Sequence, residues 1–197
     1  MTVGFAARFP VLFHVTRVAA VPSIRRHGLL SAEALCRLFG LAEADADVLL
    51  GRNREQWVEL GHPEHGRAVL RRQTMPDRAL AVRLAPGVTA EAWRRFINRH
   101  VFLWTAARDA HKLAAADPDV PQVVLRFDTA ALIALGLDLH AAPVNGGAID
   151  RRPPASGHRR GPDLYTAVVR LPARARVREV VIPQAVPAAI LARALLP

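Results

Sequence analysis

The chain opens with apolar residues whose spacing first fits a strand and then a helix. Residues 11–15 (VLFHV) form a short apolar run that predicts a strand, and this strand ends at the polar residue Thr16. Apolar residues at three-residue spacing then predict a helix over residues 19–27, with Gly28 as its C-terminal stop. A strand therefore passes almost directly into a helix at this end of the chain.

Polar capping residues predict where four further helices begin. Each stands directly before a segment with helical spacing, where its side-chain oxygen can accept a hydrogen bond from the first turn. We expect the second of these helices to reach about residue 99, the third to reach about residue 116, and the fourth to close at Gly136. The predicted capping residues are Ser31, Thr89, Thr105 and Asp128.

Short apolar runs predict further strands in the second half of the chain. Residues 40–78 are more polar, with weak helical patterns at 42–50 and 54–60, so we expect a partly irregular segment there. The mixture of short strands and interspersed helices, without a repeat or a break in composition, predicts one α+β domain over residues 1–197. The further strands are predicted at residues 101–104, 122–127, 141–144, 164–171 and 177–182.

A long basic loop is predicted over residues 146–163, which are rich in Gly, Pro and Arg. The chain carries 27 Lys and Arg against 17 Asp and Glu, and this net charge of +10 favours polyanions through counterion release. Nucleic acid is the expected partner, and a solvated basic surface without a specific ligand is the alternative. The loop arginines predicted to contact nucleic acid are Arg151, Arg152, Arg159 and Arg160.

Composition and spacing exclude several other classes. Cys36 is the only cysteine, which excludes an internal disulfide and a cysteine-rich zinc site. His62, Glu64 and His65 do not match the zinc-binding helix, whose histidines are four residues apart, so we expect no metal. We find neither a Rossmann fingerprint nor a signal peptide, and no apolar stretch approaches the roughly 20 residues that span a bilayer. These features predict a cytoplasmic protein without membrane contact.

Two segments at opposite ends of the chain resemble one known family. Residues 12–31 (LFHVTRVAAVPSIRRHGLLS) resemble the start of the ADP-ribosyltransferase fold, a strand ending in His-x-Thr, a turn, a helix and then Gly-Leu. Residues 178–190 (REVVIPQAVPAAI) resemble the strand that bears the catalytic glutamate in the DNA-targeting ADP-ribosyltransferase toxins called DarT. The segments HGRAVLRRQ, RHVFLWT and PVNGGA resemble the sequences of an uncharacterised bacterial domain family that is related to these enzymes.

This resemblance implies a fold, a reaction and partners. The fold would be an ADP-ribosyltransferase-like mixed sheet with interspersed helices. The reaction would be transfer of ADP-ribose from NAD, used as a co-substrate without a metal, to DNA or RNA. The protein would act as a toxin or phage-defence effector, which makes an antitoxin a further partner to consider. Two alternatives remain, an NAD-dependent RNA 2′-phosphotransferase and a non-catalytic nucleic-acid-binding module whose cleft is absent or filled.

The resemblance also assigns residues, with Glu179 as the catalytic carboxylate. A carboxylate near the ribose hydroxyls stabilises the oxocarbenium-like charge that develops when the bond to nicotinamide breaks. The alternative for Glu179 is a strand-edge residue paired with Arg176 or Arg178. Arg67 and Arg71 would share a face if their segment is helical, and either suits the pyrophosphate or the orientation of the nucleophile.

The remaining assigned residues would bind NAD. His14 and Thr16 project to one face of their strand, where they can hydrogen-bond ribose hydroxyls, and we expect them to share a cleft with Glu179 on a neighbouring strand. Val15 stands where many members have glycine. Phe102 or Trp104 would replace a stacking tyrosine, and Asn145 would bind nicotinamide or make a turn. Arg67 is assigned to catalysis beside Glu179, and the assigned NAD-binding residues are His14, Val15, Thr16, Ser23, Arg71, Trp104 and Asn145.

Overall fold

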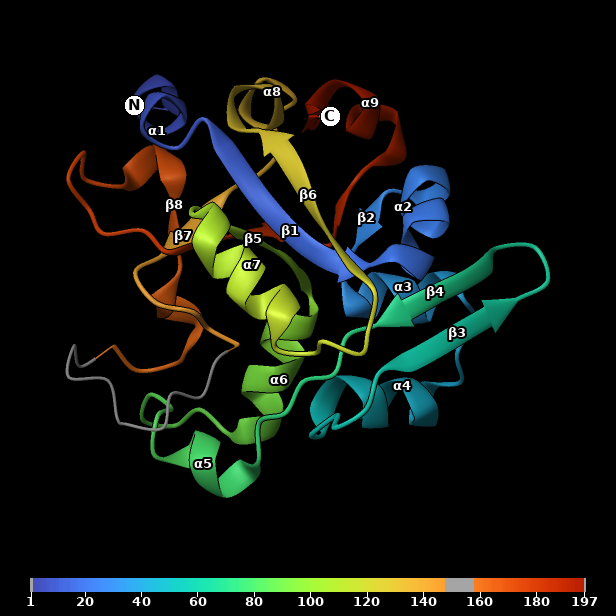
Figure 1. The fold of residues 1–197 in the computed structure, drawn as a ribbon. Coiled ribbons are helices and arrows are strands. Elements are labelled where there is room, and N and C mark those ends of the chain that lie inside the picture. The colour runs from blue at the N-terminus through green and yellow to red at the C-terminus, as the bar shows by residue number, and fades with distance from the viewer. Residues whose placement is uncertain (1, 148–157, 197) are drawn as a thin grey trace.

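A computed structural model of the chain, which describes residues 2–147 and 158–196, is built on one large antiparallel sheet (Figure 1). Within the described residues the sheet has seven strands, in the order β11-β6-β1-β5-β9-β7-β8. The predicted α+β class is confirmed, whereas the expected mixed sheet is wrong because every strand pair is antiparallel. The strands are β1 (Val11–Arg17), β5 (His100–Trp104), β6 (Gln122–Asp128), β7 (His140–Ala142), β8 (Thr166–Ala167), β9 (Glu179–Pro183) and β11 (Leu195–Leu196).

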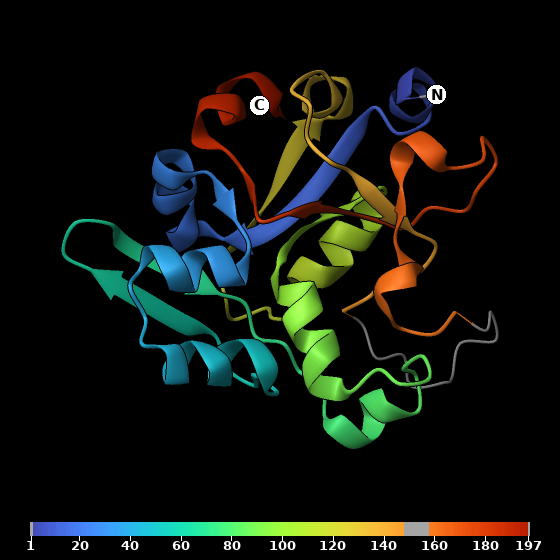
Figure 2. The ribbon, with the colours of Figure 1, turned by 180° about the vertical axis from the view of Figure 1, so that it is seen from behind.

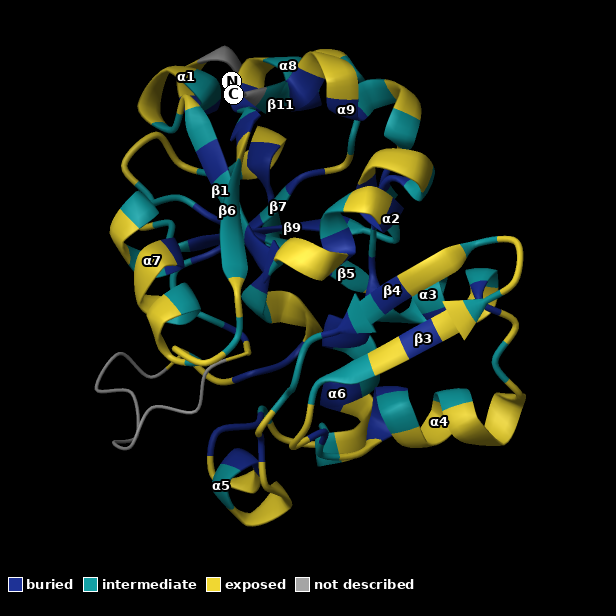
Figure 3. Ribbon diagram, turned by 45° about the vertical axis from the view of Figure 1, so that its right-hand side comes forward, coloured by how far each residue is buried: buried dark blue, intermediate teal, exposed yellow. Residues whose placement is uncertain are grey.

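Helices cover both faces of this sheet, as the two opposite views show (Figures 1 and 2). The main core contains apolar residues from α1 (Thr2–Arg8), α2 (Val21–His27), α8 (Thr129–Ala134) and α9 (Ala188–Ala194). Two further cores, on the other face, contain residues from α6 (Ala90–Asn98) and α7 (Ala107–Ala115). Strands β5 and β9 are mostly buried and β1 and β6 are mostly of intermediate burial, while the outer helix faces are exposed (Figure 3).

Residues 29–81 form a layer beside the sheet. Leu60, Ala68 and Leu70 of a β-hairpin pack with Cys36 and Phe39 in a core of their own. Because these apolar positions alternate with exposed ones, the hairpin forms where a helix at 54–60 was expected, and that prediction is wrong. The elements are β2 (Leu29–Leu30), α3 (Ala32–Leu38), α4 (Glu43–Gly51), β3 (Val58–His62), β4 (Gly66–Leu70) and α5 (Asp77–Ala81), and β2 pairs with β10 (Ala185–Val186).

The predicted helix caps are confirmed at three of four positions. The side chains of Ser31, Thr89 and Asp128 each accept a hydrogen bond from the amide three residues later. Thr105 was expected to cap α7, but its hydroxyl instead donates to the carbonyls of Val177 at 3.2 Å and Arg178 at 3.1 Å. Thr105 therefore ties the end of β5 to the chain that enters β9.

The predicted strand over residues 164–171 is largely wrong. Only Thr166–Ala167 pair in the sheet, between the 3-10 turns Pro162–Leu164 and Val168–Arg170. A third such turn, Val18–Ala20, joins β1 to α2. No helix in the described residues combines the length and the apolar composition needed to cross a bilayer.

The large sheet splits between β1 and β5. β1 pairs with β6 from Val11↔Asp128 to Arg17↔Gln122, and β5 pairs with β9 from His100↔Pro183 to Trp104↔Glu179. The two halves join through a single pair of residues, Phe13↔Trp104. Beyond this pair the ladder between β1 and β5 ends, and a gap opens at the C-terminal half of β1.

We expect Gly28→Ala to destabilise the protein more than the matched change Gly40→Ala. Both glycines have a positive φ, 92° and 63°, so alanine costs roughly 1–2 kcal/mol at Gly40 and at least as much at Gly28, whose ψ of 172° belongs to a region that essentially only glycine adopts. At Gly28 the new Cβ would also lie 2.5 Å from the carbonyl oxygen of Val186, whereas nothing lies within 4 Å of it at Gly40. Urea unfolding should show a further loss of about 1–3 kcal/mol for Gly28→Ala. Equal losses would show that the contact between α2 and β10 is not tight.

Candidate functional site

A pocket of about 400 Å³ opens at the split in the sheet. Its walls come from β1, β5, α2 and β4, with Glu179 of β9 and Asn145 at one end. The volume lies within the range of small-molecule sites, about 300–1,000 Å³. All the predicted NAD-binding residues line this pocket together with Glu179: His14, Val15, Thr16, Ser23, Arg71, Trp104 and Asn145.

His14 bridges the split. Its Nδ1 lies 2.8 Å from the carbonyl oxygen of Phe102 in β5, a group that no longer pairs with β1. Since a carbonyl can only accept, Nδ1 carries the proton and Nε2 of the neutral ring is a hydrogen-bond acceptor. Burial lowers the pKa of His14 to about 4, against the raising effect of the Phe102 carbonyl, and the positive charge of Arg71 lowers it further. The imidazole is therefore neutral at physiological pH.

Glu179 is a buried carboxyl group at the start of β9, with 2% of its surface exposed. Its Oε1 accepts hydrogen bonds from the Gly146 amide at 3.0 Å and from the Tyr165 hydroxyl at 2.7 Å. Burial raises the pKa of Glu179 to about 7, although these two donors and the charges of Arg160 and Arg178 act to lower it. The carboxyl group therefore changes its charge close to neutral pH.

Among the described residues Glu179 forms no salt bridge, so the alternative interpretation, a pair with Arg176 or Arg178, is not what the structure shows. Arg178 instead pairs with Asp109 of α7 at 3.3 Å and lies 6.0 Å from the centroid of the Trp104 ring. A buried carboxyl group without a salt bridge is costly for stability, so such groups occur mainly where function requires them.

The strand arrangement differs from the one expected for His14 and Glu179. We expected neighbouring strands, but β5 lies between β1 and β9. In a regular sheet, the pairs Glu179↔Trp104 and Trp104↔Phe13 would put Glu179 and His14 on opposite faces. Both nevertheless line the pocket, because it occupies the gap that opens where β1 and β5 separate.

Two hydroxyl groups of the N-terminal segment line the same pocket. Thr16 and Ser23 are 9% and 7% exposed, and neither side chain hydrogen-bonds to another described residue. Ser23 lies in the first turn of α2, as predicted from the sequence. Because a hydroxyl group can both donate and accept hydrogen bonds, these two groups are suited to a polar ligand.

Asn145 and Trp104 form the end of the pocket near Glu179. Asn145 makes a turn, since its Oδ1 accepts from the Gly147 amide at 2.8 Å. It also lines the pocket, so both roles considered for it from the sequence are compatible with its position. Trp104 is 7% exposed and packs with Val15 and Ala110.

Arg67 lies on strand β4 and Arg71 directly follows it, so their segment is not helical and the condition for a shared helix face is not met. Arg71 lines the pocket, where it donates to Gln122 at 2.7 Å and lies 4.8 Å from the centroid of the Trp57 ring. It also lies 3.5 Å from Asp117, which pairs with Arg72 as well. Arg67 is exposed on β4 and does not line the pocket, so the structure does not support the catalytic role expected for it.

The loop arginines fall into three groups. Arg151 and Arg152 lie outside the described residues. Arg159 is exposed, and its guanidinium lies 3.3 Å from the Leu84 carbonyl oxygen. Arg160 is only 2% exposed, and it donates to the Asn145 carbonyl at 3.1 Å. Arg160 therefore supports the segment next to Glu179 and is not a surface residue for nucleic acid.

The described residues contain no group of three or more His, Cys, Asp or Glu side chains that could hold a metal ion. His62 and His65 of the HPEH segment stack with ring centroids 4.4 Å apart in the turn between β3 and β4. His62 Nδ1 accepts from the amides of Glu64 and His65, so it supports the turn of the hairpin.

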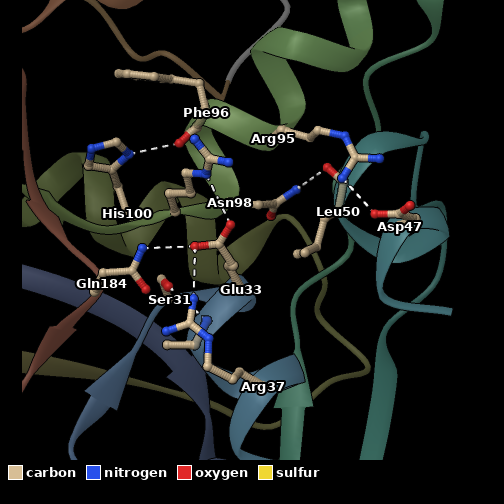
Figure 4. Close-up of polar contacts among 12 residues, drawn as sticks. Ser31, Glu33, Arg37, Asp47, Leu50, Arg95, Phe96, Asn98, His100 and Gln184 are labelled. Carbon is tan, nitrogen blue, oxygen red and sulfur yellow. Dashed lines mark hydrogen bonds and ion pairs between the residues drawn. The ribbon is translucent and has the colours of Figure 1, made fainter. Parts of the chain in front are cut away.

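Sequence reasoning missed Arg54, a buried cation in the pocket wall. It is 7% exposed, and it donates to the Arg71 carbonyl at 2.8 Å and to the Leu49 carbonyl. No carboxylate of the described residues pairs with it, and burial lowers its pKa to about 10. Its neighbour Asn98 also lines the pocket and donates to the Leu50 carbonyl at 2.9 Å (Figure 4). Nothing in the local sequence distinguishes Arg54 from the many other arginines.

A polar cluster beside the pocket fixes α3 against the strands (Figure 4). Glu33 accepts from Gln184 at 2.8 Å and from Arg99 at 3.0 Å, and Arg37 lies 3.5 Å away on the same helix. Gln184 has a φ of 61°, which is strained for a residue other than glycine. The cluster thus holds the chain in this turn between β9 and β10.

Tyr165 and Gly146, the two donors to Glu179, were also missed. Tyr165 is the only tyrosine of the chain, which is the one signal that could have drawn attention to it.

Comparison with known proteins identifies a family without a known function. A model of the family of unknown function DUF7002 matches residues 10–191, so the chain belongs to this family. No curated protein and no solved structure matches the chain.

We expect His14 and Glu179 to affect stability with opposite pH dependence. Between pH 4.5 and 7, folded Glu179 holds a proton that the unfolded chain releases, so its contribution falls as pH rises. Between pH 4 and 6.5, folded His14 lacks a proton that the unfolded chain binds, so its contribution rises with pH. Urea unfolding across this range should show that each group changes the free energy of unfolding by about 3 kcal/mol. The contribution of each group is obtained by subtracting the free energy of unfolding of Glu179→Gln, or of His14→Gln, from that of the wild type at each pH.

The two variants serve as controls for each other, because each retains the titration that the other removes. If both difference curves are flat, or if their slopes have the same sign, the charge states assigned to this pocket are wrong.

Proposed function

We propose that this member of the DUF7002 family binds NAD in the pocket and transfers its ADP-ribose to nucleic acid. The observation that carries this proposal is the position of Glu179, a buried carboxyl group that no described residue pairs in a salt bridge and that shares a pocket with neutral His14. The open pocket also favours a ligand-binding protein over a module whose cleft is filled by side chains.

Glu179 would act on the bond between nicotinamide and ribose. This bond breaks with its electron pair going to nicotinamide, which leaves positive charge on the ribose C1′ and ring oxygen. The carboxylate stabilises that charge and accepts a hydrogen bond from a ribose hydroxyl, as carboxylates do in glycoside hydrolysis. A nucleophile of the acceptor then bonds to C1′ and gives up its proton. Because Glu179 titrates at about pH 7, the active ionised form increases with pH across neutrality.

The other pocket residues match the parts of NAD. The neutral His14 ring offers Nε2 as an acceptor to a ribose hydroxyl, and the Thr16 and Ser23 hydroxyls supply donors and acceptors beside it. Trp104 gives an apolar wall and Asn145 an amide for the nicotinamide carboxamide. Arg71, with Arg54 behind it, places positive charge on the hairpin side, where the pyrophosphate would lie.

Basic residues support nucleic acid as the acceptor. The net charge of +10 favours nucleic acid, and exposed Arg159 lies on the chain that leads to Tyr165 and Glu179. Arg151 and Arg152 precede it in the sequence and lie outside the described residues. An RNA 2′-phosphotransferase would use the same co-substrate, and the two reactions are distinguished by their products.

We expect Glu179→Gln to reduce nicotinamide release from NAD by at least about a hundredfold, because the carboxylate acts on charge that develops in the transition state. Its affinity for NAD, measured by calorimetry, should stay within several-fold of wild type. Glu64→Gln is the matched control, since Glu64 is exposed in the hairpin turn and should leave activity unchanged. Nicotinamide release by Glu179→Gln at the wild-type rate would contradict the role of Glu179.

We expect mass spectrometry of oligonucleotides incubated with the protein and NAD to show the added mass of ADP-ribose. Single-stranded and duplex DNA and RNA, and a 2′-phosphorylated RNA, would be compared with the Glu179→Gln protein as a control. Loss of phosphate from the 2′-phosphorylated RNA would instead identify a phosphotransferase. Nicotinamide release without any modified oligonucleotide would exclude nucleic acid as the acceptor.

A further inference from the structure

Two hydrogen-bond donors converge on one oxygen of Glu179. The Gly146 amide and the Tyr165 hydroxyl both donate to Oε1, at 3.0 Å and 2.7 Å, and no described residue donates to Oε2. We propose that Tyr165 is a positioning residue that, together with the Gly146 amide, fixes Oε1 of Glu179 and reserves Oε2 for the ligand. The identity of that ligand rests on the proposed function, whereas the arrangement of donors does not.

The Tyr165 ring is held in place by a stack of aromatic rings. Trp93 and Phe96 of α6 lie 6.4 Å and 5.8 Å from it between ring centroids, with interplanar angles of 16° and 29°. His100 of β5 lies 6.5 Å away at 12°. Tyr165 is 8% exposed, so its hydroxyl has little freedom to leave Glu179. A donor fixed in this way keeps the carboxylate in place without reorganisation when positive charge develops on the ligand beside it.

Position 146, beside the Tyr165 hydroxyl and the Glu179 carboxyl group, has room only for glycine. A Cβ at this position would lie 2.1 Å from the Tyr165 hydroxyl oxygen and 3.3 Å from Oε1 of Glu179. Any side chain would therefore displace the hydroxyl or the carboxylate. At Gly147, the next residue, a Cβ would meet only Asn145 Oδ1, at 3.6 Å, which is ordinary contact. The chain thus offers a matched pair of positions, one inside the arrangement and one just outside it.

The chemical effect of the two donors is to favour the ionised carboxylate. Hydrogen bonds to a charged group stabilise the charged form, against the burial that favours the neutral acid. Burial and the adjacent Glu179 raise the pKa of Tyr165 well above its usual value, so the phenol stays a donor across the physiological range. The charges that act on Glu179 are Arg160 and Arg178, and Arg178 is itself paired with Asp109.

The test is to measure the ionisation of Glu179 directly in the full chain. Carbon-13 NMR of the glutamate carboxyl groups, with Glu179 assigned by its loss in Glu179→Gln, gives the midpoint of its titration. Tyr165→Phe keeps the stacked ring and removes only the hydroxyl, so it should raise the midpoint by roughly one pH unit. Gly146→Ala should raise it as well, because it displaces the hydroxyl, while Gly147→Ala should leave it at the wild-type value.

A second readout follows the reaction. If nicotinamide release requires ionised Glu179, Tyr165→Phe should shift the pH–rate curve upward by the same amount and recover activity at higher pH. A purely structural tyrosine would lower the rate equally at every pH. The NMR titration needs no activity, so an unchanged midpoint in Tyr165→Phe overturns this inference, whereas a shifted midpoint without NAD turnover would contradict only the proposed function.

Discussion

The site depends on the break in the sheet between β1 and β5. A regular ladder would pair these strands along the whole of β1 and would leave no space for a ligand. The hydrogen bond between His14 Nδ1 and the Phe102 carbonyl, 2.8 Å long, instead satisfies one main-chain group that the break exposes. The cost of an unpaired buried carbonyl is thereby avoided, and the gap can persist as a pocket. On the side away from the break, β1 is paired with β6 and β5 with β9 along their whole lengths.

The same geometry sets the charges within the pocket. Burial keeps His14 neutral, with its pKa lowered to about 4, and raises the pKa of Glu179 to about 7. The pocket therefore holds a neutral acceptor and a carboxyl group that ionises near neutrality, with the cations Arg54 and Arg71 on the hairpin side. An acid, a neutral base and two cations line one cavity, and the NAD proposed as its ligand has a cationic end and an anionic middle that these groups would complement.

Local sequence patterns predicted the parts of the fold that local forces determine. The strand that ends at Thr16 and the caps at Ser31, Thr89 and Asp128 follow from short-range spacing and hydrogen bonding. The hairpin of β3 and β4 was missed because its alternation is only five residues long on each strand and is mixed with polar residues. Thr105 has the sequence of a helix cap, but long-range contacts with the start of β9 use its hydroxyl instead.

The site was predictable only in part for a similar reason. Residues in the two motifs at the chain ends could be assigned from their pattern, and they line one pocket. Tertiary packing brings Arg54 to the pocket wall and Gly146 and Tyr165 to Glu179, and no short pattern marks these three residues. Arg160 was misjudged because a basic, Gly- and Pro-rich segment indicates an exposed loop, whereas its guanidinium is needed inside to support Asn145.

The most direct test of the central claim, that the pocket holds NAD, uses the three tryptophans of the chain. Trp57 and Trp104 line the pocket, and Trp93 does not. In a nitrogen-15 NMR titration with NAD, we predict that the indole N–H signals of Trp57 and Trp104 shift with the same saturation curve, while that of Trp93 changes least. The account would be contradicted if NAD at millimolar concentration left the Trp57 and Trp104 signals unchanged, or if it shifted only Trp93.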